Sequence, residues 1–178
     1  MANANKKVTR EKKDGNYYID VRHNPYISRI LFSEEDIERE TSNLANWINE
    51  NYEGKKPFLI PILTGSMYFF TKVFSKLLID CQTDTIEFSS YLTGGVKKLP
   101  VPLLRKALSS HVKGQHVIVF DDVCDTGITI REVKKFILRQ KPKSIKFVTL
   151  VNKPKQNKTG IQPDYWCFEN NAPWILGF

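Results

Sequence analysis

The segment VIVFDDVCDTGITI, residues 117–130, constrains the fold of this chain more than any other stretch. Four apolar β-formers, Val117–Phe120, lead directly into two adjacent carboxylates, Asp121 and Asp122, and the turn Asp125–Thr129 follows three residues later. A short apolar run that ends in acids and a glycine-bearing turn, before a stretch of helical periodicity, is typical of an α/β protein. This segment therefore predicts a strand, a turn and a helix, with polar groups gathered at the carboxyl end of the strand.

The remaining sequence predicts the same architecture, because strand and helix patterns alternate along it. The expected strands are Pro57–Leu63, Thr85–Tyr91, His116–Asp121 and Ser144–Val151. The expected helices run from a cap at Ser33 and Asp36 to Gly54, from Met67 to Leu78, and from Ile128 to Arg139, and Leu92–Lys98 is an expected mobile loop. We predict an open, mostly parallel sheet flanked by helices, which binds its ligands at the carboxyl ends of the strands.

Composition favours one globular domain outside the membrane. The chain has 178 residues, of which 41% are hydrophobic and 26% are charged. No apolar run approaches the roughly 20 residues that span a bilayer, and the polar N-terminus lacks the apolar core of a secretory signal. The three cysteines form no CxxC pair, which predicts reduced thiols and a cytoplasmic location.

Net charge raises the question of an anionic partner. The chain carries 27 basic and 19 acidic side chains, a net charge of +8. The basic residues are spread out and accompany no recognition helix or zinc module, so we expect no nucleic-acid partner. A solvated basic surface is the favoured explanation of the charge over a nucleic-acid groove, and a highly anionic small molecule as ligand is a third.

The residues around the turn predict a site for a phosphorylated sugar. Backbone N–H groups at a helix start favour an anion, and Thr126 and Thr129 add hydroxyl donors. Asp121 and Asp122 suit sugar hydroxyls, a metal ion or both. A capped helix start with solvated acids explains each residue singly, whereas a ribose 5-phosphate site explains the whole combination.

The same residues resemble the phosphoribosyl diphosphate (PRPP) motif of the type I phosphoribosyltransferases, and Asp125 resembles the members that act on 6-oxopurines, the hypoxanthine-guanine enzymes. The other matching segments are ILFSEEDI, PILTGSMYF, SSY, LVNK, PDYWCFE and PWILGF, within residues 30–178. The resemblance implies the type I fold over residues 30–178, with a small hood built from the chain ends. We expect hood strands near residues 163–178, and a basic, partly flexible segment 1–29 that can contribute to the hood.

The resemblance also implies a reaction, in which PRPP and a 6-oxopurine give a nucleoside monophosphate and pyrophosphate. Asp125, Thr126, Gly127, Ile128 and Thr129 would hold the 5-phosphate. Asp121 and Asp122 would hold the ribose hydroxyls with Mg²⁺ close by, and Asp125 would act as general base at the purine N7. The remaining implied roles fall on Lys153 at the 6-oxo group, Trp174 stacked on the base, Ile175 at its 2-position edge, Leu63, Thr64 and Gly65 at the pyrophosphate, and Ser90 and Tyr91 as a lid.

The resemblance leaves several points open. Thr64 stands where many relatives carry lysine, and Ile128 where a basic or polar residue is frequent. Longer relatives supply a metal-binding aspartate and a pyrophosphate-binding arginine from a C-terminal extension, so we expect these contacts to be lost or replaced by Lys97, Lys98 or Arg105. The preference among hypoxanthine, guanine and xanthine is undetermined, and a homodimer or homotetramer is expected from the family. A regulatory protein that senses PRPP or nucleotides on the same fold, with nucleic acid bound to its basic surface, is the alternative.

Overall fold

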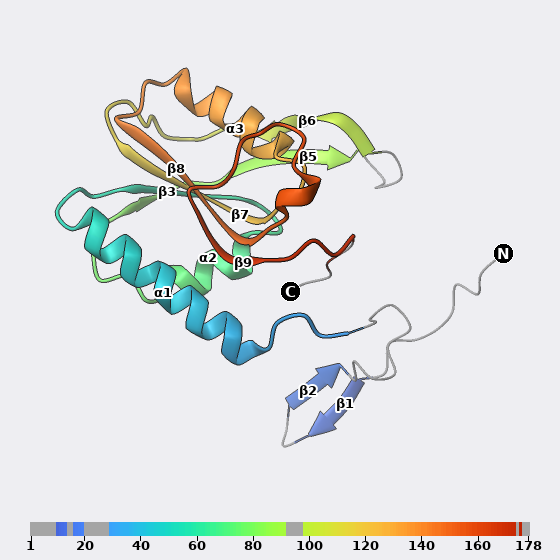
Figure 1. The fold of residues 1–178 in the computed structure, drawn as a ribbon. Coiled ribbons are helices and arrows are strands. Elements are labelled where there is room, and N and C mark those ends of the chain that lie inside the picture. The colour runs from blue at the N-terminus through green and yellow to red at the C-terminus, as the bar shows by residue number, and fades with distance from the viewer. Residues whose placement is uncertain (1–9, 14–15, 20–28, 92–97, 174, 176–178) are drawn as a thin grey trace.

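The computed structural model describes residues 10–13, 16–19, 29–91, 98–173 and 175, and its main body is a central sheet between helices (Figure 1). In the described residues this sheet has seven strands in the order β6-β5-β3-β7-β8-β9, with β4 paired to β3. Its strands are β3 (Phe58–Leu63), β4 (Gln82–Thr83), β5 (Ile86–Tyr91), β6 (Lys98–Lys106), β7 (His116–Cys124), β8 (Ser144–Asn152) and β9 (Tyr165–Glu169). A separate antiparallel pair consists of β1 (Arg10–Lys13) and β2 (Asn16–Ile19).

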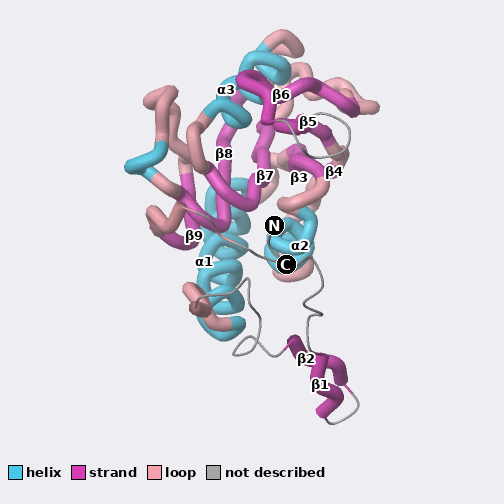
Figure 2. Tube along the Cα trace, turned by 90° about the vertical axis from the view of Figure 1, so that its right-hand side faces the viewer, coloured by secondary structure: helices cyan, strands magenta, loops and turns pink. Residues whose placement is uncertain are grey.

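The main sheet is parallel except at one edge, which confirms the expected fold class. Strands β5, β3, β7, β8 and β9 pair in parallel, and only β6 runs antiparallel, against β5. Figure 2 shows the strands of this sheet lying between α3 and α1. The sequence reading did not foresee β6, whose prolines Pro100 and Pro102 are tolerated because the strand lies at the edge of the sheet.

The segment Tyr165–Glu169, which we expected to belong to the hood, is the opposite edge strand, β9. It pairs in parallel with Val148–Asn152 of β8. The stacked rings of Phe32 and Phe168, with centroids 4.0 Å apart, connect this edge to the chain before α1. The division of the chain into a basic segment and a hood otherwise stays a prediction.

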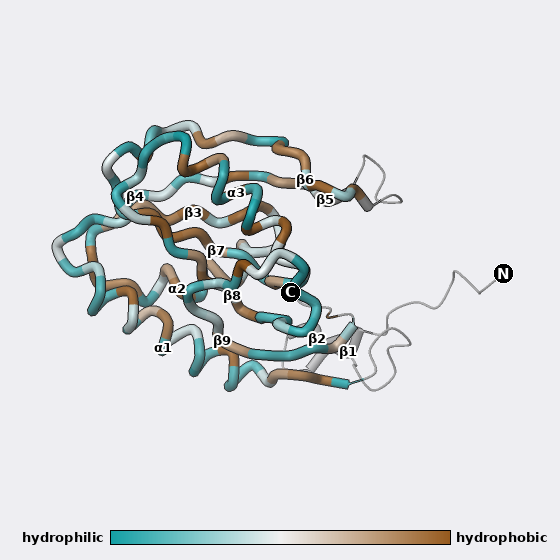
Figure 3. Tube along the Cα trace, turned by 45° about the horizontal axis from the view of Figure 1, so that its top comes forward, coloured by the Kyte–Doolittle hydropathy of each residue, from teal (hydrophilic) through white to brown (hydrophobic). Residues whose placement is uncertain are grey.

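Helices cover both faces of the sheet. The helices α1 (Glu34–Tyr52) and α2 (Met67–Phe74) lie on one face, and α3 (Ile128–Leu138) lies on the other (Figure 1). Alternate residues of β7 point to opposite faces: Ile118 and Phe120 pack with α1 and α2, and Val117 and Val119 pack with α3. All four are fully buried, as expected for a strand covered on both sides, and the apolar central strands are visible in Figure 3.

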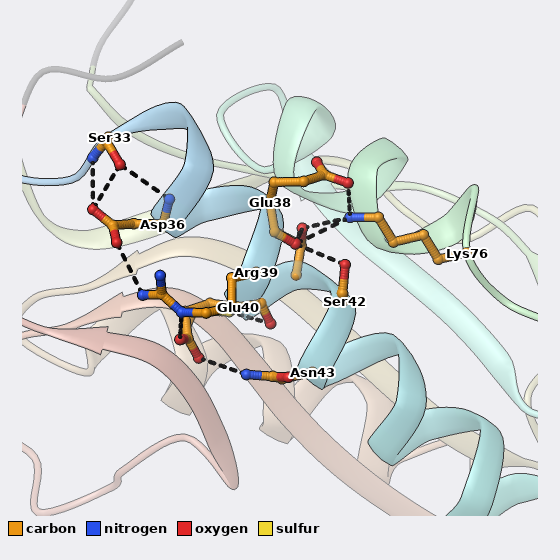
Figure 4. Close-up of polar contacts among 10 residues, drawn as sticks. Ser33, Asp36, Glu38, Arg39, Glu40, Ser42, Asn43 and Lys76 are labelled. Carbon is orange, nitrogen blue, oxygen red and sulfur yellow. Dashed lines mark hydrogen bonds and ion pairs between the residues drawn. The ribbon is translucent and has the colours of Figure 1, made fainter.

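A capping box fixes the start of α1. The Ser33 hydroxyl accepts from the Asp36 N–H at 3.1 Å, and the Asp36 carboxylate accepts from the Ser33 N–H at 3.1 Å (Figure 4). Such a cap stabilises a helix by about 0.5–2 kcal/mol. Further along, Glu38 pairs with Lys76 at 2.9 Å and with Lys72 at 3.2 Å, which joins α1 to α2.

Two boundaries differ from the sequence prediction by three residues or more. The helix α2 ends at Phe74 rather than at Leu78. Strand β7 continues to Cys124, because Val123 and Cys124 still pair with Val151 and Asn152 of β8. Both acids of the motif therefore lie within the strand, whereas the predicted strand ended at Asp121. None of the helices described is long and apolar enough to cross a membrane.

Candidate active site

A pocket of about 550 Å³ opens at the carboxyl ends of β3 and β7. It brings together most of the predicted site residues, which are far apart in the sequence. Among its lining residues are Leu63, Thr64, Gly65, Asp121, Asp122, Asp125–Thr129, Lys153 and Ile175. Trp174 and the side chains of Ser90 and Tyr91 lie outside the described residues. Arg105, an expected substitute ligand, does not line this pocket, and the side chains of Lys97 and Lys98 are not described.

The turn before α3 forms the floor of the pocket. Gly127 occupies the left-handed region at φ +76° and is the N-cap residue of α3. A Cβ at this position would collide with the Thr159 hydroxyl, so both the backbone conformation and the available space require glycine. The first N–H groups of α3 have no acceptor within the helix. The N–H of Ile128 lies 3.5 Å from the Thr126 hydroxyl oxygen, and N–H groups at such a helix start can donate to an anion such as a phosphate.

The two adjacent acids differ in exposure. Asp121 is only 8% exposed, and burial together with the neighbouring Asp122 raises the pKa of its carboxyl well above the usual value. Asp122 accepts from the Val123 N–H at 2.8 Å and lies against the turn after β3. A Cβ on Gly65 would approach the Asp122 Oδ2 atom to 2.5 Å, so a larger residue there would have to displace the acid.

Asp121 and Asp122 are the predicted ligands of Mg²⁺. The described residues contain no cluster of three metal-ligating side chains. Mg²⁺ is commonly bound by one or two carboxylates together with substrate phosphates. Asp121 and Asp122 fit binding of this kind, in which the substrate completes the coordination.

Lys153, the residue directly after β8, faces Asp125 in the pocket. The lysine is 4% exposed, and its Nζ lies 3.8 Å from the Asp125 Oδ1 and 3.4 Å from the Pro173 carbonyl oxygen. The Asp125 Oδ1 is itself buried and accepts no hydrogen bond. A buried polar atom normally has a hydrogen-bond partner. The carboxylate oxygen and the ammonium group are therefore available to a ligand that faces both of them. The lysine backbone N–H donates to the Cys124 carbonyl at 2.9 Å, which fixes the distance between the two strands.

The turn between β3 and α2 lines another side of the pocket. It contains a cis peptide bond between Leu63 and Thr64. The Met67 N–H donates to the Thr64 carbonyl at 3.2 Å, and the buried Ser66 hydroxyl donates to the Ile62 carbonyl at 2.6 Å. The turn and the start of the helix at Met67 are where the sequence predicted them.

Sequence reasoning missed two groups of residues near the pocket. The hairpin β5-β6 contributes lining residues, namely Glu87, Phe88, Ser89, Leu99, Pro100 and Pro102. Asn157 and Thr159 support Gly127 from behind. The segment Asn157–Gly160 has the composition of a turn, but no pattern in the sequence indicates which part of the molecule this turn touches.

Comparison with known proteins identifies the family. A family profile described as "Phosphoribosyl transferase domain" matches residues 30–178. The chain belongs to the phosphoribosyltransferase family. This confirms the resemblance recognised in the sequence.

Individual phosphoribosyltransferases match over most of the chain. The hypoxanthine-guanine phosphoribosyltransferase of Streptococcus thermophilus is 32% identical over 152 residues, 85% of this chain and 84% of that protein. The hypoxanthine-guanine-xanthine phosphoribosyltransferase of Tritrichomonas foetus is 33% identical over 153 residues, 85% of this chain and 82% of that protein. A crystal structure of the Bacillus anthracis hypoxanthine-guanine enzyme superposes with a TM-score of 0.71 at 31% identity, covering 79% of this chain and 80% of that one.

One cysteine of this phosphoribosyltransferase lies inside the motif. Burial, with further contributions from Asp121 and Asp125, raises the pKa of the Cys124 thiol to about 12. The thiolate is the nucleophilic form of cysteine, and the raised pKa favours the thiol form of Cys124. It serves as a packing residue between β7 and α3.

Proposed function

We propose that this phosphoribosyltransferase transfers the 5-phosphoribosyl group of PRPP to a 6-oxopurine, giving a nucleoside 5′-monophosphate and pyrophosphate. The observation that carries the proposal is the pair formed by the Lys153 Nζ and the unbonded Asp125 Oδ1, 3.8 Å apart. A 6-oxopurine presents O6 and N7 side by side on one edge. A cation and a carboxylate at this spacing match that edge, the lysine donating to O6 and the aspartate accepting the proton at N7.

The other residues of the pocket would hold the sugar and the leaving group. The start of α3, with Thr126 and Thr129, would bind the 5-phosphate through N–H and hydroxyl donors. Asp121 and Asp122 would bind the ribose hydroxyls and, together with the substrate, Mg²⁺. The metal would neutralise charge on the departing pyrophosphate, whose oxygens the turn Leu63–Gly65 would contact.

Asp125 would act as the general base. Positive charge develops on the ribose as its bond to pyrophosphate breaks. The purine ring must lose a proton when its nitrogen attacks the ribose. A carboxylate beside N7 stabilises or removes the proton there as the new bond forms.

Three of the predicted contacts rest on the resemblance alone. Trp174 would stack on the purine, Ile175 would meet its 2-position edge, and Ser90 and Tyr91 would close over the ribose to exclude water. Assembly as a homodimer or homotetramer is proposed on the same ground.

A spectrophotometric assay tests the proposal. The protein is mixed with PRPP, Mg²⁺ and hypoxanthine, guanine or xanthine, with adenine as the mismatched base. We expect turnover with at least one 6-oxopurine and a kcat/KM for adenine lower by more than about 100-fold, because a donor would face the amino group. Binding of PRPP without turnover on any base would contradict the proposal and favour the regulatory alternative.

A further inference from the structure

One segment of the chain touches both ends of the pocket. This segment, Lys153–Thr159, is called here the bridging segment and includes the 3₁₀ turn Pro154–Gln156. It follows β8 and contains the lysine already placed at the base. None of its remaining residues lines the pocket, so any role they have is exerted through the groups that they hold.

Its C-terminal half supports the phosphate-binding turn from behind. The Lys158 N–H donates to the Thr126 carbonyl at 3.0 Å. The Thr159 hydroxyl and the Asn157 amide pack so closely on Gly127 that no Cβ fits between them. These residues contact Gly127, whose left-handed conformation directs the chain into α3.

Asn157 gives this support its rigidity. Its Oδ1 accepts from the N–H groups of Thr159 and Gly160, each at 3.0 Å, and from the Thr159 hydroxyl at 3.2 Å. Its Nδ2 donates to the Ile161 carbonyl at 2.7 Å. A single side chain thereby closes the whole turn that rests on Gly127.

The N-terminal half of the bridging segment holds the other end of the pocket. The Gln156 amide donates to the carbonyls of Asn171 and Ala172 at 3.3 and 3.4 Å. The Lys155 N–H donates to the Asn171 Oδ1 at 3.0 Å, and the Lys153 ammonium donates to the Pro173 carbonyl. These bonds hold the segment 171–173, which precedes the pocket residue Ile175.

We propose that the bridging segment holds the phosphate-binding and purine-binding ends of the pocket at a fixed distance, with Asn157 and Gln156 as its two positioning residues. The inference rests on the proposed function and deepens it. A nucleoside monophosphate spans both ends, so its affinity depends on their spacing. Asn157 sets the position of the phosphate end and Gln156 that of the purine end, and each can be weakened separately.

The test compares Asn157→Ala and Gln156→Ala with Asn49→Ala. Asn49 is a matched control, because it also bonds backbone groups, the Lys76 carbonyl and the Leu78 N–H, but lies outside the pocket. Ribose 5-phosphate binding is measured by calorimetry, and KM for PRPP and for the purine by the assay above. Thr159→Val, which keeps volume and loses only the hydroxyl, serves as a milder second probe of the phosphate end.

We expect Asn157→Ala to weaken ribose 5-phosphate binding and raise KM for PRPP by about ten-fold, with purine KM and kcat changed much less. Gln156→Ala should raise purine KM by roughly three- to ten-fold and leave ribose 5-phosphate binding unchanged. Thr159→Val should act like Asn157→Ala but more weakly. Equal changes in both KM values, or effects no larger than those of Asn49→Ala, would overturn the inference.

The controls separate this inference from the proposed function. If the unmodified protein binds ribose 5-phosphate and turns over a 6-oxopurine while both variants behave like Asn49→Ala, only the inference fails. If the unmodified protein neither binds ribose 5-phosphate nor turns over any purine, the proposed function fails and the inference fails with it.

Discussion

The phosphate end and the purine end of the pocket are assembled in different ways. The phosphate end, Asp121–Thr129, is one continuous stretch, in which a buried strand ends in a glycine turn and a helix. The purine end joins Lys153 on one segment to Pro173 and Ile175 on another. Local backbone geometry defines the first, whereas hydrogen bonds between distant segments define the second.

This difference has a consequence for how each end tolerates change. Strand β7 pairs with β3 as far as Phe120 and with β8 as far as Cys124, so the backbone at the acids of the phosphate end is held from the β8 side. The purine end depends on a few bonds of 3.0–3.4 Å made by Lys153, Lys155 and Gln156. We expect substitutions at the phosphate end to act mainly through backbone conformation, and those at the purine end through lost polar contacts.

The largest expected effect is at the residue where the two ends meet. Asp125→Asn keeps the shape and hydrogen-bonding capacity of the side chain but cannot take up a proton. General acid–base catalysis contributes about 10²–10⁴-fold, and we expect kcat to fall within that range while PRPP binding stays nearly unchanged. Steady-state kinetics and calorimetry check this. Parallel losses of binding and turnover would make Asp125 a structural cap.

Gly127→Ala tests whether backbone conformation controls the phosphate end. The substitution forces a side chain into a left-handed conformation and against Thr159, and strain of this kind costs about 1–3 kcal/mol. We expect ribose 5-phosphate binding to weaken by up to about 100-fold. Gly114→Ala is the matched control, because Gly114 has φ +70° but no atom within 4 Å of an added Cβ. Equal effects of both substitutions on binding would contradict the prediction.

Lys153→Met tests the polar recognition at the purine end. The 6-oxopurine loses one charge-assisted hydrogen bond, worth roughly 1.5–3 kcal/mol, while adenine loses an unfavourable neighbour. The ratio of kcat/KM for hypoxanthine over adenine should fall by about 10- to 100-fold. Ribose 5-phosphate binding should not change. An unaltered ratio would exclude Lys153 from the recognition of the 6-position.

The smallest expected effect is on thermal stability. It compares two acids, Asp121 and Asp84, whose pKa values are shifted in opposite directions. The raised pKa of Asp121 means that its contribution to folding is full at low pH and is lost as the pH rises above 3.8 through the raised value. Asp121→Asn should therefore melt at a higher temperature than the unmodified protein at pH 7 in metal-free buffer, with a smaller gain at pH 4. Thermal unfolding at the two pH values measures it.

Asp84→Asn is the control of opposite sign. Burial alone would raise the pKa of Asp84, but N–H donors from Thr85, Ser110 and Ser109, together with Lys106, lower it. Its contribution to stability is therefore present above pH 3.8 and is lost as the pH falls through the lowered value. Asp84→Asn should lower the melting temperature at pH 7. A shift in the same direction for both substitutions would contradict the assignment.

The sequence by itself determined the fold class and the phosphate end of the site. Hydrophobic periodicity and the turn at Gly127 involve only a few neighbouring residues, so both can be recognised in the sequence. The resemblance to the family was recognised from this stretch together with segments elsewhere in residues 30–178. The helix α1 and strands β3, β5, β7 and β8 were placed to within a few residues for the same reason.

Only the tertiary structure decided where β6 and β9 lie, how far β7 extends and what holds the purine end. Edge strands such as β6 take prolines that would end a central strand, and β7 continues because β8 supplies partners beyond Asp121. The contacts of Asn157 with Gly127, and of Gln156 with Asn171, join residues whose spacing in the sequence carries no period. Contacts of this kind depend on the packing of the finished sheet, and therefore appear only in three dimensions.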